Sequence, residues 1–150
     1  MTAIQSATPY LALSGGTVTG PVTVGGNITE NGHLQFGASI PQLAIAAGAG
    51  TNPPSPVLVT GSNDCAGAIT WGTGTTPNTQ VQVSVTFATP WVIPGGGAPH
   101  ICVTAQNAAT AALGIYASGA SPTGFALGVQ TAPAAGQTSG TYSFNYIVLG

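Results

Sequence analysis

Few side chains in this sequence could carry out chemistry. The acidic residues are Glu30 and Asp64, histidine occurs twice, and Lys and Arg are absent. Glycoside hydrolysis normally needs two carboxylates, one acting as acid and the other as base or nucleophile. Because Glu30 and Asp64 lie in different parts of the chain, they could meet only across subunits or through an unexpected fold-back. We therefore expect no catalytic carboxylate pair and no enzyme.

Asp64 lies in the sequence Ser-Asn-Asp, whose residue types are typical of turns. We expect its carboxylate to close an Asx-type turn on its own backbone before the next strand. The alternative is a cation site on a symmetry axis, where three copies of Asp64 would supply the oxygen ligands that hard cations prefer.

The two imidazoles, His33 and His100, are far apart in the sequence. His33 directly precedes Leu34 and should point outward if Leu34 points inward, and His100 precedes an apolar run. Three copies of either one on an axis could bind a transition metal, but we expect hydrogen-bonded or exposed imidazoles, no metal and no cofactor. A Ser-His-Asp triad is not supported, because His100 and Asp64 fall in separate expected strands and the sequence has no G-x-S-x-G turn.

Cys65 and Cys102 are the two thiols. Two cysteines do not make a disulfide framework in a chain of 150 residues. We expect two buried thiols in strands, since unpaired cysteine is among the most often buried residue types. Pairing of the two stays open at this point.

The composition excludes several classes of partner. Nucleic acid and anionic membrane surfaces are bound mainly by Lys and Arg, which this chain lacks. Membrane insertion is not expected either, because Gly, Pro, Thr and Asn interrupt every apolar stretch well short of about 20 residues. The start of the chain has no secretory signal pattern. A net charge of −2 offers little repulsion between copies, which suits a protein that works inside an assembly.

The elements expected around these residues are strands. The chain contains 23 Gly and 12 Pro, and alternating apolar runs recur between turn residues. In the cleanest run Val81, Val83, Val85 and Phe87 share one face, and Gln82 lies on the other. One helical turn is plausible within residues 105–113. The expected strands are PVLVTG, GAITWG, QVQVSVTFA, HICVTA, LGIYAS, GFALGVQ and YSFNYIVLG. They predict an all-β fold with a C-terminal β-sandwich, resembling a jelly roll, over residues 57–150.

Residues 13–36 carry a repeated phrase in which an aliphatic residue follows a glycine by two positions. The aliphatic residues of this phrase are Val18, Val22, Ile28 and Leu34. So short a unit must stack on its own next turn or on identical chains. Four phrases are too few for a single-chain β-helix, so we predict a trimeric β shaft with these side chains in its core. Residues 1–12 would form an attachment segment, and residues 37–56, which end in a proline cluster, a linker.

The run YLALSGGTVTGPVTVGGNITENGHLQF, residues 10–36, resembles the repeat found in bacteriophage tail fibres and other virion fibres. The runs VTGSNDCAGAITWGTG, VSVTFATPW and FNYIVLG resemble the compact β-rich tip domains of such fibres and spikes. The resemblance implies a homotrimer on the virion surface, made in the host cytoplasm. Its N-terminus would bind capsid or tail and baseplate proteins, and its C-terminal knob would attach to the host surface. Long tail fibres carry many repeats and this chain has one block, so a short fibre, a head fibre or a capsid spike fits at least as well.

The function expected on these grounds is structural. Exposed Trp71 or Trp91 could stack on sugar rings of a host glycan, although core filling is the usual role of such aromatics. One alternative is a capsid-decoration or head-fibre protein with no receptor role. Others are a glycan-degrading spike tip and, more remotely, a lectin-like module outside any virus.

Overall fold

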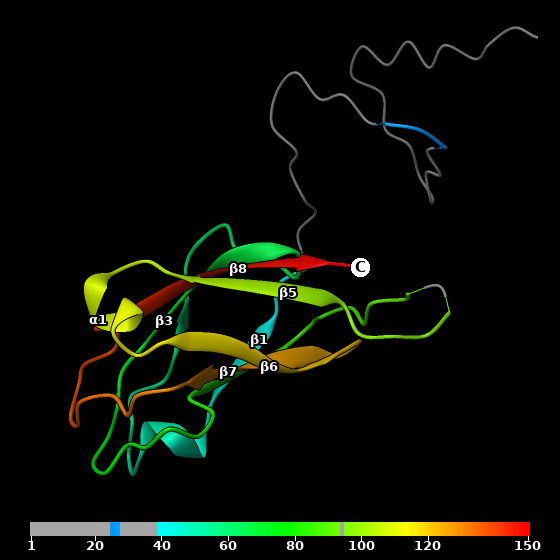
Figure 1. Cartoon of the computed structure of the whole chain (residues 1–150). Coiled ribbons are helices and arrows are strands. Elements are labelled where there is room, and N and C mark those ends of the chain that lie inside the picture. The colour runs from blue at the N-terminus through cyan, green and yellow to red at the C-terminus, as the bar shows by residue number, and fades with distance from the viewer. Residues whose placement is uncertain (1–24, 28–38, 94) are drawn as a thin grey trace, which may run out of the picture. The chain divides into compact units, whose positions relative to one another are not determined.

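The computed structural model describes residues 25–27, 39–93 and 95–150 (Figure 1). The chain divides into two units, Met1–Leu34 and Gln35–Gly150. The predicted shaft positions Val18, Val22, Ile28 and Leu34, together with Glu30 and His33, lie outside the described residues.

The second unit is built from two four-stranded antiparallel sheets. One has the order β1-β4-β7-β6, formed by Gln42–Ile45, Val83–Thr86, Gly124–Val129 and Ile115–Ser121. The other has the order β2-β3-β8-β5, formed by Val57–Leu58, Ala66–Trp71, Tyr142–Leu149 and His100–Ala105. Each strand expected between residues 57 and 150 is present, and the all-β prediction is confirmed.

Alternation along the strands places the core between the two sheets. In β8, Phe144, Tyr146 and Val148 are buried while Asn145, Ile147 and Leu149 are exposed. This is the two-residue period of a sheet with one buried face. The core takes side chains from both sheets, chiefly from β3 and β8 on one side and β4 and β7 on the other: Ile69, Trp71, Val83, Val85, Phe125, Leu127, Val129, Tyr142, Phe144, Tyr146 and Val148.

The expected helical turn is also present. α1 spans Ala108–Ala111 and begins at Asn107, whose side-chain oxygen accepts a hydrogen bond from the Thr110 backbone N–H at 2.8 Å. This is an N-cap, which satisfies one of the free N–H groups of the first turn. The buried Thr110 hydroxyl in turn accepts a hydrogen bond from the Ser143 N–H, so the turn is joined to the start of β8.

The prediction of a linker over residues 37–56 is wrong. Within it, β1 pairs with β4 from Gln42 opposite Thr86 to Ile45 opposite Val83, and the 3₁₀ turn η1 follows at Ala47–Ala49. Leu43 and Ile45 pack against the core. The strand is short and followed by Ala and Gly, so its alternation was too weak to distinguish from a spacer.

The antiparallel pairing gives the sandwich two distinct ends. The chain enters the described sandwich at Ser39, and the loops 59–65, 87–93 and 122–123 and Gly150 lie at the same end. The loops 46–56, 72–82, 106–114 and 130–141 lie at the opposite end (Figure 1). We call these the Ser39 end and the loop end. In the sequence, both strands of the β4–β7 pair lie between the two strands of the β3–β8 pair. The jelly-roll description stays a prediction.

Candidate binding surfaces

Asp64 ties three segments together at the Ser39 end. It is 5% exposed, and its two carboxylate oxygens accept hydrogen bonds from the backbone N–H groups of Ala88 at 3.0 Å and Thr89 at 2.9 Å. Its own N–H donates to the Ser39 carbonyl at 2.8 Å. A buried carboxylate is costly unless it is hydrogen-bonded, and here the loop after β4 supplies the donors. Asp64 therefore fixes the position of this loop.

The expected Asx turn is made by the preceding residue. The Asn63 side-chain oxygen accepts hydrogen bonds from the N–H groups of Cys65 at 2.8 Å and Ala66 at 3.0 Å. The prediction that Asp64 closes this turn was wrong, because the Asp64 carboxylate is directed to donors 24 and 25 residues away. Turn propensity alone could not distinguish the two neighbours.

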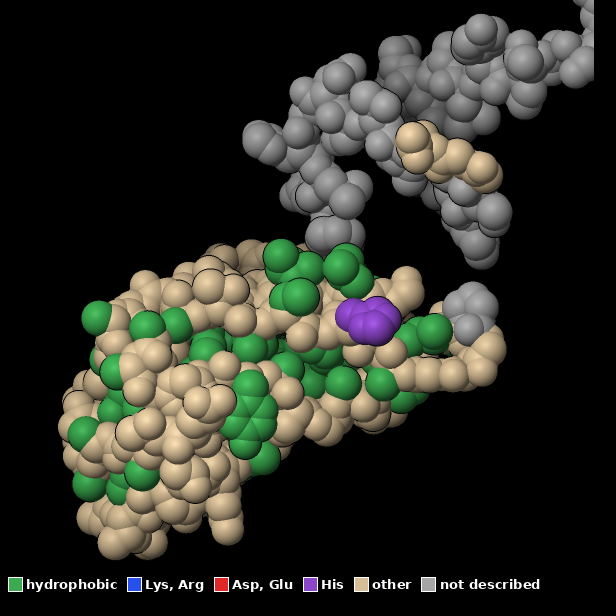
Figure 2. Space-filling view, viewed as in Figure 1, with side chains coloured by type: hydrophobic (Ala, Val, Ile, Leu, Met, Phe, Trp, Pro, Cys, Tyr) green, Lys and Arg blue, Asp and Glu red, His purple; other side chains and the backbone are tan. Residues whose placement is uncertain are grey.

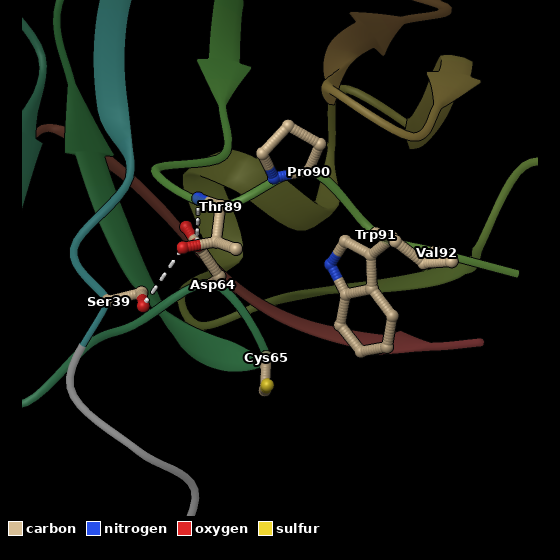
Figure 3. A pocket seen from close by; sticks show the side chains of 7 residues that line it. All are labelled: Ser39, Asp64, Cys65, Thr89, Pro90, Trp91 and Val92. Atoms are coloured by element: carbon tan, nitrogen blue, oxygen red, sulfur yellow. Dashed lines mark hydrogen bonds between the residues drawn. The ribbon is translucent and has the colours of Figure 1, made fainter. Parts of the chain in front are cut away.

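An open pocket of about 330 Å³ lies beside Asp64 (Figure 3). Its lining combines hydroxyl groups, a carboxylate, a thiol and an indole with apolar residues: Ser39, Asp64, Cys65, Thr89, Pro90, Trp91 and Val92. The hydroxyls of Ser39 and Thr89 lie 3.4 Å apart, within hydrogen-bond distance. Burial, and secondly the Asp64 carboxylate, raise the pKa of the Cys65 thiol, so this thiol is a poor nucleophile near neutral pH.

The two tryptophans have different environments. Trp91 is partly buried, borders the pocket, and packs its ring against Phe87 with centroids 6.4 Å apart. Trp71 is fully buried and packs against Tyr142 at 5.2 Å and Phe144 at 5.7 Å. Trp71 therefore cannot stack on a sugar ring, so the prediction of a receptor contact is wrong for Trp71, and for Trp91 it stays a prediction.

The cysteines do not form a pair within the chain. Cys102 lies opposite Ile147 on one side of β8, and the Cys65 carbonyl accepts a hydrogen bond from Val148 on the other side. The two cysteines are therefore two strand spacings apart, each of roughly 4.8 Å. Together these spacings exceed about 7 Å, the largest distance between Cα atoms that a disulfide can bridge. Both thiols are free. The prediction of buried thiols was wrong for Cys102, which is exposed on an outward position of β5, and Cys65 is half-buried.

The outer face of the β2-β3-β8-β5 sheet carries several exposed apolar side chains beside polar ones such as Asn145 and Thr104. We call this surface the hydrophobic face and define it by Val57, Val59, Ala66, Cys102, Ile147 and Leu149. A hollow of about 450 Å³ lies near its centre, lined by residues that include Ala66, Gly67, Cys102 and Ile147. Figure 2 shows a group of hydrophobic side chains on the side of the sandwich where β5 and β8 lie. His100 lies opposite Leu149 at the margin of this face.

A second hollow, of about 450 Å³, lies between loops at the loop end. Its lining is dominated by hydroxyl and amide side chains, glycines and two prolines: Thr51, Asn52, Pro53, Pro54, Thr73, Gly74, Thr75, Gly136, Gln137 and Thr138. Backbone hydrogen bonds join its loops, with Thr51 and Thr75 exchanging two bonds and Thr73 donating to Gln137. The loop end is therefore an ordered, polar surface in which none of the lining residues carries a charge.

The described part of the chain contains no cluster of three or more His, Cys, Asp or Glu side chains that could hold a metal ion within one protomer. Among the same residues, no helix is long and apolar enough to cross a membrane. Comparisons of the chain with family models, curated proteins and solved structures found no match.

Proposed function

We propose that this chain is a non-enzymatic structural subunit of a phage-like particle. Three copies form a short fibre or spike that binds capsid or tail proteins through the N-terminus and presents its C-terminal sandwich for attachment to the host surface. The observation that carries the proposal is a β-sandwich with very sparse charge that directly follows a glycine-phrased segment resembling virion fibre repeats.

The arrangement of the sandwich supports a display role. The chain enters at the Ser39 end, and four long loops meet at the other end. The loop end lies opposite the point where the chain enters the sandwich, so we infer that it is the surface presented to the host. Because its hollow is lined by hydroxyl and amide groups without charge, it suits an uncharged, hydroxyl-rich partner such as a neutral glycan.

The environment of the Asp64 carboxylate supports a non-enzymatic role. Asp64 is the one acidic side chain among the described residues, and both of its oxygens hold backbone N–H groups. A general acid or nucleophile needs a carboxyl group that can reach substrate, and Asp64 is directed to the loop after β4 instead. Its arrangement is that of a structural anchor.

Attachment by such a fibre depends on multivalency. Linked binding sites raise the effective concentration of the second and third contacts, so weak individual contacts give strong attachment. Three sandwiches in one fibre, and several fibres in one particle, would provide this linkage.

Negative-stain electron microscopy of the purified full-length chain tests the proposal. We expect particles with a three-lobed head and a thin stem. Incubation with purified surface glycans, followed by a reducing-end assay, should show no cleavage. Single globules without a stem would contradict the fibre, and release of reducing ends would contradict the structural assignment.

A further inference from the structure

We propose that the hydrophobic face of the sandwich packs against the same sheet of two further copies of this chain. The inference rests on the homotrimer proposed above and identifies the surface through which the sandwiches associate.

Four of the seven exposed large hydrophobic side chains among the described residues lie on this face, and the others, Ile40, Val92 and Tyr116, lie elsewhere. Val57, Val59, Ile147 and Leu149 are 50%, 42%, 48% and 53% exposed, respectively. Single exposed apolar residues are normal, but contiguous ones mark interaction sites. Ile147 lies between Ala66 on β3 and Cys102 on β5 in the strand register, and Leu149 is the next outward residue of β8. Val59 adjoins this group through Ala68, the next outward residue of β3, to whose carbonyl its N–H donates.

The other sheet provides an internal comparison. The corresponding outward positions of β4 and β7 are Ser84, Thr86, Ala126 and Gly128. On that side the Tyr116 ring covers Gly128, where an added side chain would collide with it. The sandwich therefore has one outer face with mainly small and polar residues, and one that carries large aliphatic side chains among polar ones.

Charge favours a second and third copy of this chain as the occupant. Around a threefold axis each side chain near the axis meets its own copies, so a charge there would be repelled by identical charges. None of the residues that define the hydrophobic face is charged, so this cost is absent. A partner with a charged surface would instead leave its charges desolvated against an apolar sheet.

The shape of the face agrees with this occupant. The hollow at its centre is lined by the small residues Ala66, Gly67 and Cys102, and also by Thr104, Asn145, Tyr146 and Ile147. It has room for an aliphatic side chain from a neighbouring copy. Insertion of such side chains would bury apolar surface on both partners, which is the dominant favourable term in association.

Cys102 reports directly on burial of this face. In a Cys65→Ser background it is the sole thiol of the full-length chain. We expect the native assembly to react with a maleimide about tenfold more slowly than the urea-unfolded chain, because a neighbouring copy excludes the reagent from the thiol. Light scattering on the same sample gives the number of copies.

Two lysine variants make the test specific to the face. Ile147→Lys introduces a charge at its centre and should restore fast Cys102 labelling. Thr86→Lys introduces the same charge at an exposed strand position of the other sheet and should leave labelling slow. Circular dichroism checks that both variants fold. If Ile147→Lys fails to fold, the comparison of native with unfolded parent protein still decides the question.

The possible outcomes separate this inference from the proposed function. A trimer with a protected Cys102 supports both. A trimer in which Cys102 reacts as fast as in the unfolded chain overturns the inference and leaves the fibre intact. A dimer with a protected Cys102 supports the face and contradicts the trimer. A monomer overturns both, and protection of Cys102 in a monomer would show that the chain covers its own face.

Discussion

At the scale of single residues, Asp64 is the main determinant of structure at the Ser39 end. Its oxygens bind the Ala88 and Thr89 N–H groups, and its backbone binds the Ser39 carbonyl. The loop after β4 then leads directly to Trp91, whose N–H donates to the Pro122 carbonyl. The pocket beside Asp64 therefore depends on one side chain for the position of one of its walls.

Replacement of this carboxylate should destabilise the sandwich. We expect Asp64→Ala to lower the free energy of unfolding by about 2 kcal/mol, because two hydrogen bonds to a charged group are lost. Gln42→Ala, at an exposed edge position, should change it by less than about 0.5 kcal/mol. Urea unfolding followed by fluorescence measures both. Equal stability of the Asp64→Ala variant and the parent would contradict the anchoring role.

Because the phenol of Tyr146 is buried, we expect the stability of the sandwich to depend on pH in the alkaline range. Burial, followed by the nearby Asp64 and Cys65, raises the pKa of its phenol, and its hydroxyl donates to the Asn63 carbonyl. The unfolded-state tyrosine ionises near its ordinary pKa of about 10. Because the folded-state pKa is the higher one, the stabilisation is fully present below about pH 10 and is lost as the pH rises above that value.

The Tyr146→Phe variant isolates this effect. The difference in unfolding free energy between parent and variant should be largest at about pH 8 and shrink by up to about 1.4 kcal/mol for each pH unit above the ordinary tyrosine pKa. Urea titrations at several pH values provide the measurement. A difference that stays constant up to about pH 11 would show that the environment of Tyr146 does not disfavour its ionised form.

The burial of individual side chains was harder to predict than the strands and turns that carry them. Cys65 and Trp71 lie in a turn and a strand that the sequence indicates correctly, but their burial depends on partners from other elements. Gln82 was expected outside and is fully buried, where its amide donates to the Asn78 and Gln80 carbonyls. Its strand begins only at Val83, so the alternation did not extend to position 82.

At the scale of elements, the short helix α1 is held by its cap. Asn107 accepts the Thr110 N–H at 2.8 Å, and its amide donates to the Thr141 carbonyl at 3.2 Å. The side chain thus joins the helix to the segment that leads into β8. Two loops of the loop end depend on this contact.

The Asn107→Ala variant should lose about 1 kcal/mol of unfolding free energy, since the cap is removed and no replacement acceptor is present. Gln106→Ala is a suitable control, because the exposed Gln106 side chain donates to the exposed Asn145 side chain. Its removal should lower the unfolding free energy by only a few tenths of a kcal/mol, since the backbone bond from Gln106 to the Ser143 carbonyl is kept. Thermal melts followed by circular dichroism compare them. A larger loss for Gln106→Ala would contradict the importance of the cap.

Strand positions were predictable because each strand alternates between turn residues. GFALGVQ and YSFNYIVLG became β7 and β8, and the Ala-rich run became one helical turn. The pairing of those strands was not predictable, because it depends on contacts between residues far apart in the sequence. For the same reason the anchoring contact between Asp64 and the loop after β4 had no local signal.

At the scale of the whole molecule, sparse charge is the property that connects fold and proposed function. A sandwich without Lys or Arg has no cationic contacts to offer, and its solubility depends on hydroxyl and amide groups. Its aliphatic outer face is unusual for a protein that works alone. Both features are consistent with a subunit that is stable mainly within an assembly of its own copies.

The mass of the purified full-length chain in solution, measured by light scattering, tests the central claim most directly. We expect a mass of about three times 14.5 kDa and resistance of the assembly to detergent in an unheated gel. The same mass should be found at about 0.1 M and about 1 M salt, because screening has little effect where contacts are uncharged. A monomer under these conditions would contradict the fibre and leave a single β-sandwich binding module.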